Sequence, residues 1–171
     1  MLLIRQARIE DSEAIVEVVR LAFETAEMTD HDEHHLVERL RKSEAFVPEL
    51  SLVAELEDEL IGHILFTKVK VGEEVALALA PLSVLPEYQD QGVGARLIER
   101  GHQVAENLGF SSSIVLGHPT YYPKFGYLPA SDQGIQAPFE VPDEAFMVKA
   151  FVENLHIAGT VEYSAAFFLS E

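Results

Sequence analysis

The residues best suited to chemistry in this chain form a glycine-bearing loop, Gln89-Asp90-Gln91-Gly92-Val93-Gly94. An apolar run from Val75 to Leu85 precedes the loop and predicts a buried strand, and apolar residues at helical spacing follow it from Ala95 to Leu108. The first N–H groups of a helix have no intrahelical acceptor, and the helix dipole places partial positive charge there. Because glycine has no Cβ, a phosphate can approach those donors closely. The pattern predicts a site for a phosphate-bearing ligand.

Two common phosphate-binding loops do not fit this pattern. A P-loop ends in Gly-Lys-Ser/Thr, whereas Ala95-Arg96 follows Gly94 here. A dinucleotide-binding fingerprint starting at Gly92 requires a third glycine at position 97, which is Leu97. The remaining pattern, Gln-x-x-Gly-x-Gly, resembles the pyrophosphate-binding loop of the Gcn5-related N-acetyltransferases (GNAT), which is Gln/Arg-x-x-Gly-x-Gly/Ala.

A second motif lies about thirty residues downstream, in the segment 120–127. Members of this family carry a short helix ending in Tyr-x-x-x-Gly-Phe/Tyr, and Tyr122, Gly126 and Tyr127 match that pattern. The segment also resembles a branch of small acetyltransferases with Gly-x-Pro-x-Tyr-Tyr-x-x-Phe-Gly-Phe at this point. With two motifs in the family's order, the chain is identified as similar to GNAT enzymes over nearly its whole length.

The order of the predicted elements is α+β, in a single domain over 1–171. The resemblance implies a mixed central sheet that splays between two central strands, with helices on both faces. We expect strands at 2–9, 51–56, 60–71, 75–85, 113–117, 145–151 and 160–168, helices starting at Asp11-Ser12 and spanning 30–42 and 95–108, and a loop at 131–144.

Pro81 lies inside the predicted strand 75–85, where it cannot donate a hydrogen bond to a neighbouring strand. It therefore marks an edge, a bulge or a break in pairing. In the family a bulged central strand opens a V-shaped slot for the pantetheine arm of coenzyme A. The backbone of Leu82, Ser83 and Val84 would then face that arm, and the Leu82 N–H would bind the thioester oxygen.

The resemblance implies acetyl-CoA as co-substrate, no metal, and direct transfer of the acetyl group to an amine. Tyr122 is the candidate general acid for the departing thiolate, because a phenol is protonated at neutral pH. The residues implied in coenzyme binding come from the strand, the loop, the helix and the tyrosine segment: Leu82, Ser83, Val84, Gln89, Asp90, Gln91, Gly92, Val93, Gly94, Ala95, Arg96, Tyr122 and Lys124.

The general base is left open by the sequence. Some family members place a glutamate on the central strand, but residues 76–80 contain none. His118, which adjoins the tyrosine segment, is our preferred candidate. His63, Glu24 and a chain of water molecules are the alternatives. His31 and His35, at helical i,i+4 spacing, resemble a zinc pair, but their densely charged segment is typical of a solvated helix start bordering the acceptor pocket.

Composition restricts the partners. The 171 residues include 12 basic and 29 acidic side chains, a net charge of −17. Such a surface repels phosphate backbones and anionic lipid, so we expect neither nucleic acid nor a membrane as partner. It favours a cationic amine as acceptor, or serves solubility alone. The absence of cysteine excludes disulfides and a catalytic thiol, and fits a cytoplasmic protein.

Two functions fit these observations. The favoured one is an N-acetyltransferase acting on a small-molecule, peptide or protein amine, and we allow for a homodimer. The alternative is a non-catalytic acyl-CoA-binding regulatory module that keeps the loop without turnover. The tyrosine at 122 favours catalysis, whereas the missing strand glutamate leaves the alternative open.

Overall fold

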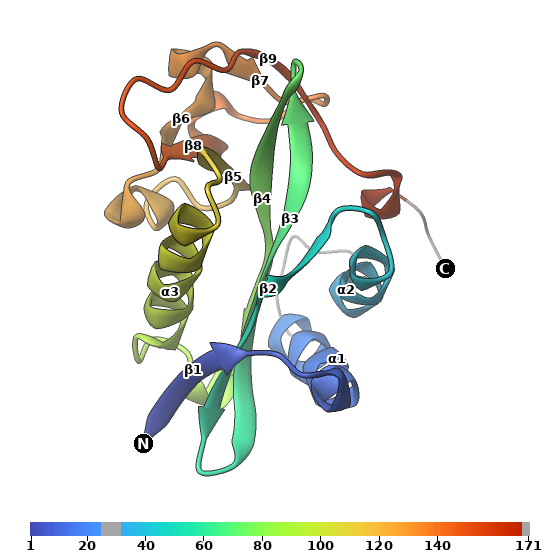
Figure 1. The fold of residues 1–171 in the computed structure, drawn as a ribbon. Helices are drawn as coiled ribbons and strands as arrows, with labels where there is room; N and C mark the ends of the chain where they lie inside the picture. The colour runs from blue at the N-terminus through green and yellow to red at the C-terminus, as the bar shows by residue number, and fades with distance from the viewer. Residues whose placement is uncertain (25–31, 169–171) are drawn as a thin grey trace.

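The computed structural model of the protein describes residues 1–24 and 32–168. Within them, one mixed sheet runs in the strand order β1-β2-β3-β4-β5-β8-β6, and β7 joins it through β9, which pairs with β3 (Figure 1). The strands are β1 Leu2–Gln6, β2 Phe46–Leu56, β3 Glu59–Val71, β4 Glu74–Val84, β5 Ser112–Leu116, β6 Leu128–Pro129, β7 Ile135–Gln136, β8 Phe146–Ala150 and β9 Gly159–Glu162.

Helices cover both faces of this sheet (Figure 1). Helix α3, Val93–Asn107, lies on one face, and α1, Ser12–Phe23, and α2, Glu33–Arg41, lie on the other. Successive side chains of a strand point to opposite faces, so Phe66 packs in the cluster beneath α3 while Leu65 packs beneath α1 and α2. The predicted α+β class, with a splayed mixed sheet and helices on both faces, is confirmed.

The sheet opens between β4 and β5. The two strands run parallel but pair only at Leu77 with Ser113 and at Ala78 with Ile114. Beyond these pairs β4 continues to Val84, and residues 79–84 form an edge without a partner on the β5 side, which we call the unpaired edge of β4. This is the splay that the resemblance implied.

A bulge in β4 lies at the start of the unpaired edge. Leu79 pairs with Phe66 on β3, but the next pair is Leu82 with Ile64, so β4 has one residue more than β3 in this interval. Leu77 and Leu79 contribute to the cluster beneath α3, and after the bulge Leu82 packs against that cluster. The extra residue therefore shifts the alternation of β4 by one. Of the three features that Pro81 could mark, an edge, a bulge or a break in pairing, the register with β3 shows a bulge.

Some element boundaries differ from the sequence predictions. The first strand ends at Gln6, because the Asp11 carboxylate accepts from the Arg8 N–H at 2.7 Å and closes a 3-10 turn at Ile9–Asp11. The strand expected at 160–168 ends at Glu162, and Ala165–Phe167 form a 3-10 turn capped by the Ser164 side chain. The expected loop 131–144 includes the short strand β7. Asp30, the expected first residue of the second helix, lies outside the described residues.

Candidate active site

The predicted phosphate loop lies at the N-terminus of α3. Gly92 is the N-cap residue in the left-handed conformation, with φ of 86°, and a Cβ there would have no heavy atom within 4 Å. A Cβ at Gly94 would lie 3.0 Å from Tyr121 Oη, 3.6 Å from Leu82 Cδ2 and 4.0 Å from Val84 Cγ2. Glycine therefore keeps open a space between the helix start, the end of β4 and a tyrosine hydroxyl.

The unpaired edge of β4 presents main-chain groups toward this space. The Leu85 N–H donates to the Ile61 carbonyl at 2.8 Å, so at Leu85 the chain hydrogen-bonds to β3. In an antiparallel pair the direction of these groups alternates, which turns Ser83 toward β3 and Leu82 and Val84 away from it. The structure thus brings Leu82 and Val84 to the predicted slot. The main-chain groups of Ser83 point toward β3 instead, and its side chain is buried.

Two glutamines brace the loop between β4 and α3. Gln89 Nε2 donates to the Val84 carbonyl at 2.9 Å, and Gln91 Nε2 donates to the Glu87 carbonyl at 3.0 Å. Asp90 between them has a φ of 62° and an exposed side chain. These contacts hold the backbone that precedes Gly92, so we assign the glutamines to the shape of the loop.

The two cations implied in coenzyme binding lie on either side of the loop. Arg96, on α3, is exposed, and its Nη1 lies 3.5 Å from the Leu2 carbonyl. Lys124 Nζ lies 4.9 Å from the centre of the Tyr121 ring. Both side chains are at the surface, where they can turn toward an anion bound at the helix start.

The tyrosine motif forms the 3-10 turn η3, Tyr122–Phe125, just after β5. The Tyr122 ring packs so closely on Gly117 that a Cβ there would overlap it, and it meets the Tyr127 ring edge-on at 5.7 Å between centroids. Burial, and secondarily the neighbouring Tyr121, raise the pKa of Tyr122 above its ordinary value. The Tyr122 phenol therefore stays protonated at neutral pH, as a general acid requires.

Tyr127 packs against this turn through the Tyr122 ring. Its ring is fully buried, and its hydroxyl lies 2.9 Å from Ser113 Oγ on β5 and 3.0 Å from His102 Nε2 on α3. Burial lowers the pKa of His102 to about 4, so this imidazole is neutral. Through these two contacts, Tyr127 links the tyrosine turn to β5 and α3, the strand and the helix next to the site.

Tyr121 is the residue that sequence reasoning left out of the site. The family pattern matched Tyr122 and placed Tyr121 one residue out of register. In the structure the Tyr121 hydroxyl lies beside Gly94, and burial raises the pKa of this phenol. The adjacent pair of tyrosines was the available signal, because a turn can direct neighbouring side chains to different walls of one space.

The candidate bases lie in different settings. His118 is exposed at the end of β5, and its carbonyl accepts from the Tyr121 N–H at 3.1 Å. His63 is buried beneath the face that carries α1 and α2, with Nε2 3.1 Å from Ser51 Oγ, and burial lowers its pKa to about 3. Glu24 directly follows α1 and lies 3.9 Å from Arg20 Nη1. Of the three, His118 lies nearest in the chain to the tyrosine turn.

Over residues 1–24 and 32–168, no three His, Cys, Asp or Glu side chains are grouped so that they could hold a metal ion. His31, one half of the suggested zinc pair, lies outside the described residues. Within the same ranges, no helix has the length and apolar character needed to cross a membrane.

Known proteins are similar to this chain in sequence and in fold. A model of the acetyltransferase (GNAT) family matches residues 14–127. The uncharacterised N-acetyltransferase YjhQ of Escherichia coli (strain K12) is 41% identical over 139 residues, which are 78% of this chain and 74% of that protein. The uncharacterised N-acetyltransferase YhbS of the same strain is 30% identical over 162 residues, 92% and 93% of the two chains. The chain belongs to the GNAT family and is an N-acetyltransferase by this membership.

Solved structures of GNAT family proteins are similar to the fold of this chain. A GNAT family acetyltransferase from Brucella melitensis, in complex with acetyl-CoA, superposes with a TM-score of 0.83 and 31% identity, covering 98% of both chains. YhbS from Escherichia coli, in complex with CoA, superposes with a TM-score of 0.88 and 28% identity, covering 98% of this chain and 92% of that one. The protein has the GNAT fold.

Proposed function

We propose that this protein uses acetyl-CoA to acetylate a primary amine of a small molecule or peptide, by direct transfer and in the cytoplasm. One observation carries the proposal most: the unpaired edge of β4 directs the main-chain groups of Leu82 and Val84 toward the space beside the Gly92–Gly94 helix start. Two similar proteins were solved with acetyl-CoA or CoA. An extended pantetheine arm and a pyrophosphate match this edge and this helix start in shape and hydrogen bonding.

The coenzyme would lie along the unpaired edge. Its pyrophosphate would accept from main-chain N–H groups of residues 92–95, and a pantetheine carbonyl would accept from the Val84 N–H, as in an added strand. The Leu82 N–H would donate to the thioester oxygen, whose negative charge grows as the carbonyl carbon becomes tetrahedral. Because backbone donors bind the phosphates, the net charge of −17 does not exclude an anionic coenzyme.

The reaction needs two proton transfers. The amine nitrogen forms a bond to the thioester carbon, the carbon–sulfur bond breaks, and the departing sulfur takes a proton from the Tyr122 hydroxyl. The amine loses its proton to a base, for which we propose His118, directly or through water. Tyr121, with its hydroxyl beside Gly94, would hold the coenzyme rather than protonate the sulfur.

A coupled assay tests the proposal. Free thiol is followed with acetyl-CoA and a panel of amines, and the acetylated amine is identified by mass. We expect thiol and acetylamine in equal amounts. Thermal stabilisation by acetyl-CoA without turnover on any amine would favour the alternative function, a non-catalytic acyl-CoA-binding module. Light scattering on the purified protein tests the homodimer.

A further inference from the structure

An apolar pocket of about 180 Å³ lies where β4 and β5 separate. Its floor includes Ala78 and Ala80 of β4, and its walls include the rings of Phe139, Tyr163, Phe167 and Phe168. Ala78 packs with Ile114 in a cluster that excludes α3, and Phe167 also packs against the cluster beneath α1 and α2. The pocket therefore opens on the face of the sheet opposite α3.

The aromatic wall is a connected set of rings from two distant segments. Phe139 stacks on Tyr163 with centroids 6.0 Å apart and planes at 20°, and Tyr163 meets Phe167 edge-on at 4.8 Å. Phe139 and Phe168 nevertheless stay 39% and 63% exposed. Aromatic side chains exposed together around a hollow, on a chain with a net charge of −17, indicate a surface that binds an apolar group.

The pocket lies beside the proposed position of the thioester. Ala78 is the last residue of β4 that pairs with β5, and Ala80 is two residues before Leu82, whose N–H would hold the thioester oxygen. Two residues span at most about 7 Å of strand, and the bulge of β4 in this interval shortens that distance. A group in the pocket can thus remain bonded to an amine at the reacting carbon.

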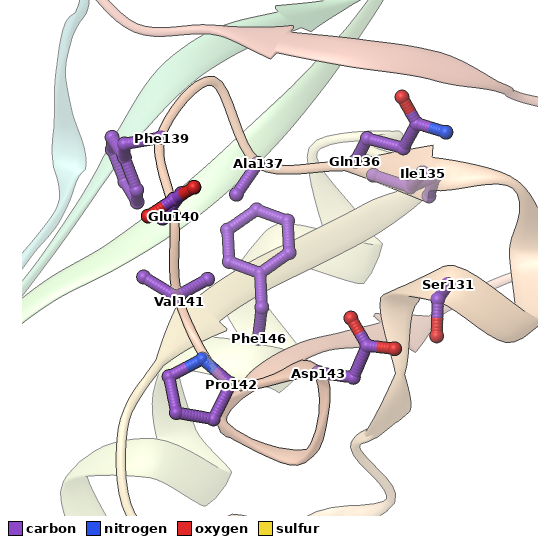
Figure 2. A pocket seen from close by; sticks show the side chains of 10 residues that line it. All are labelled: Ser131, Ile135, Gln136, Ala137, Phe139, Glu140, Val141, Pro142, Asp143 and Phe146. Atoms are coloured by element: carbon purple, nitrogen blue, oxygen red, sulfur yellow. The ribbon is translucent and has the colours of Figure 1, made fainter.

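Charge around the pocket selects the kind of amine. Among residues 1–24 and 32–168, no charged side chain lines this pocket. Phe139 also lines a larger hollow, which includes Glu140 and Asp143 and, among the same residues, no lysine or arginine (Figure 2). An acceptor carboxylate would therefore lose water without gaining a cationic partner. A protonated amine, by contrast, is attracted by the nearby carboxylates before it loses its proton.

We propose that this pocket binds the apolar group of the acceptor, and that the acceptor is an arylalkylamine or alkylamine without a carboxylate. The volume suits one aromatic ring, since an apolar cavity of about 150 Å³ is enough to bind benzene. This inference rests on the proposed acetyltransferase function and adds to it the substrate class. It also predicts that free amino acids are poor acceptors.

Matched acceptors test the proposal. With acetyl-CoA, kcat/KM is measured for phenethylamine, ethylamine and phenylalanine, which differ by the ring or by the carboxylate. We expect phenethylamine to exceed both by about tenfold or more, because even one buried methylene can change kcat/KM by roughly 10- to 200-fold. Phe139→Ala should reduce this preference. Leu128→Ala, which removes an exposed apolar side chain outside the pocket, should leave it unchanged.

The outcomes separate this inference from the function on which it rests. Equal use of phenethylamine and ethylamine, or a preference for phenylalanine, would overturn the inference and leave acetylation of amines standing. The inference would also be overturned if hexanoyl-CoA reacted faster than acetyl-CoA with ethylamine and Phe139→Ala removed that advantage. The pocket would then hold the acyl chain of the coenzyme and not the apolar group of the acceptor. Should no amine be acetylated, calorimetry of phenethylamine with CoA present decides: binding that Phe139→Ala weakens supports the pocket, and no binding overturns it.

Discussion

Replacement of Gly94 by alanine is the sharpest perturbation of the coenzyme loop. The new Cβ would enter the space bounded by Tyr121 Oη at 3.0 Å, Leu82 Cδ2 at 3.6 Å and Val84 Cγ2 at 4.0 Å. Only the tyrosine hydroxyl is closer than ordinary contact, and it ends a side chain that can turn aside. The protein should therefore still fold, while a phosphate could no longer approach the N–H groups at the helix start.

The Gly94→Ala substitution should change the free energy of unfolding less than the free energy of acetyl-CoA binding. Gly94 is the second residue of α3, and alanine in place of glycine stabilises a helix by up to about 1 kcal/mol, which offsets the close contact with Tyr121. We expect stability to change by less than about 1 kcal/mol, or a few degrees in Tm at this chain length. A lost hydrogen bond to a charged phosphate costs about 1.5–3 kcal/mol. Acetyl-CoA affinity should then fall roughly 10- to 100-fold.

Isothermal calorimetry with acetyl-CoA and thermal unfolding measure both quantities on the same samples. Gly109→Ala is the matched control, because Gly109 lies beyond the other end of α3, has a φ of 89° and has open space around it. Alanine in that conformation should cost about 1–2 kcal/mol of stability and leave affinity unchanged. Unchanged affinity in a folded Gly94→Ala protein would refute the assignment of this loop, as would an equal loss in Gly109→Ala.

Three further predictions concern the tyrosines, the surface charge and a buried histidine. Tyr122→Phe should lower kcat strongly with acetyl-CoA affinity nearly unchanged, whereas Tyr121→Phe should affect kcat much less and weaken affinity; similar effects of the two variants on kcat would contradict the assignment. If the acidic surface concentrates a cationic acceptor, kcat/KM at saturating coenzyme should fall as salt shortens the Debye length below about 10 Å, and a flat response would leave the charge a role in solubility alone. Burial lowers the pKa of His63 from 6.5 to about 3, so between these values the unfolded chain binds a proton that the folded chain does not. The free energy of unfolding should therefore decrease as the pH is lowered from 6.5 to about 3. In His63→Gln, Tm should depend less on pH there, and an unchanged slope would show that another group causes the loss.

Much of the fold could be predicted from local patterns. The glycines of the loop, the apolar run of β4 and the periodic α3 each have a signal within about fifteen residues, and all three were located to within a few residues. Because proline cannot donate to a ladder, Pro81 predicted an edge, a bulge or a break in pairing, and the register shift between Phe66 and Ile64 shows which of these is present. That the whole of 1–171 forms one domain stays a prediction.

The parts that were missed depend on pairing and on side-chain direction. Ser83 was grouped with Leu82 and Val84, but only the register with β3 reveals that its main-chain groups point the other way. The position of Tyr121 beside Gly94 depends on the turn that carries it. The aromatic pocket joins Phe139 to Tyr163 across segments with no shared motif, so no local pattern could indicate it.

Acetyl transfer from acetyl-CoA to an amine, with Tyr122 as proton donor, can be measured in one turnover. The most direct test is single-turnover thiol release, with the protein in excess over acetyl-CoA and the amine saturating, for the native protein and Tyr122→Phe. We expect one thiol and one acetylamine per bound acetyl-CoA for the native protein, and a lower single-turnover rate in the variant at unchanged coenzyme affinity. Acetyl-CoA bound at full affinity, with no acetylamine formed by the native protein from any amine tested, would contradict this expectation.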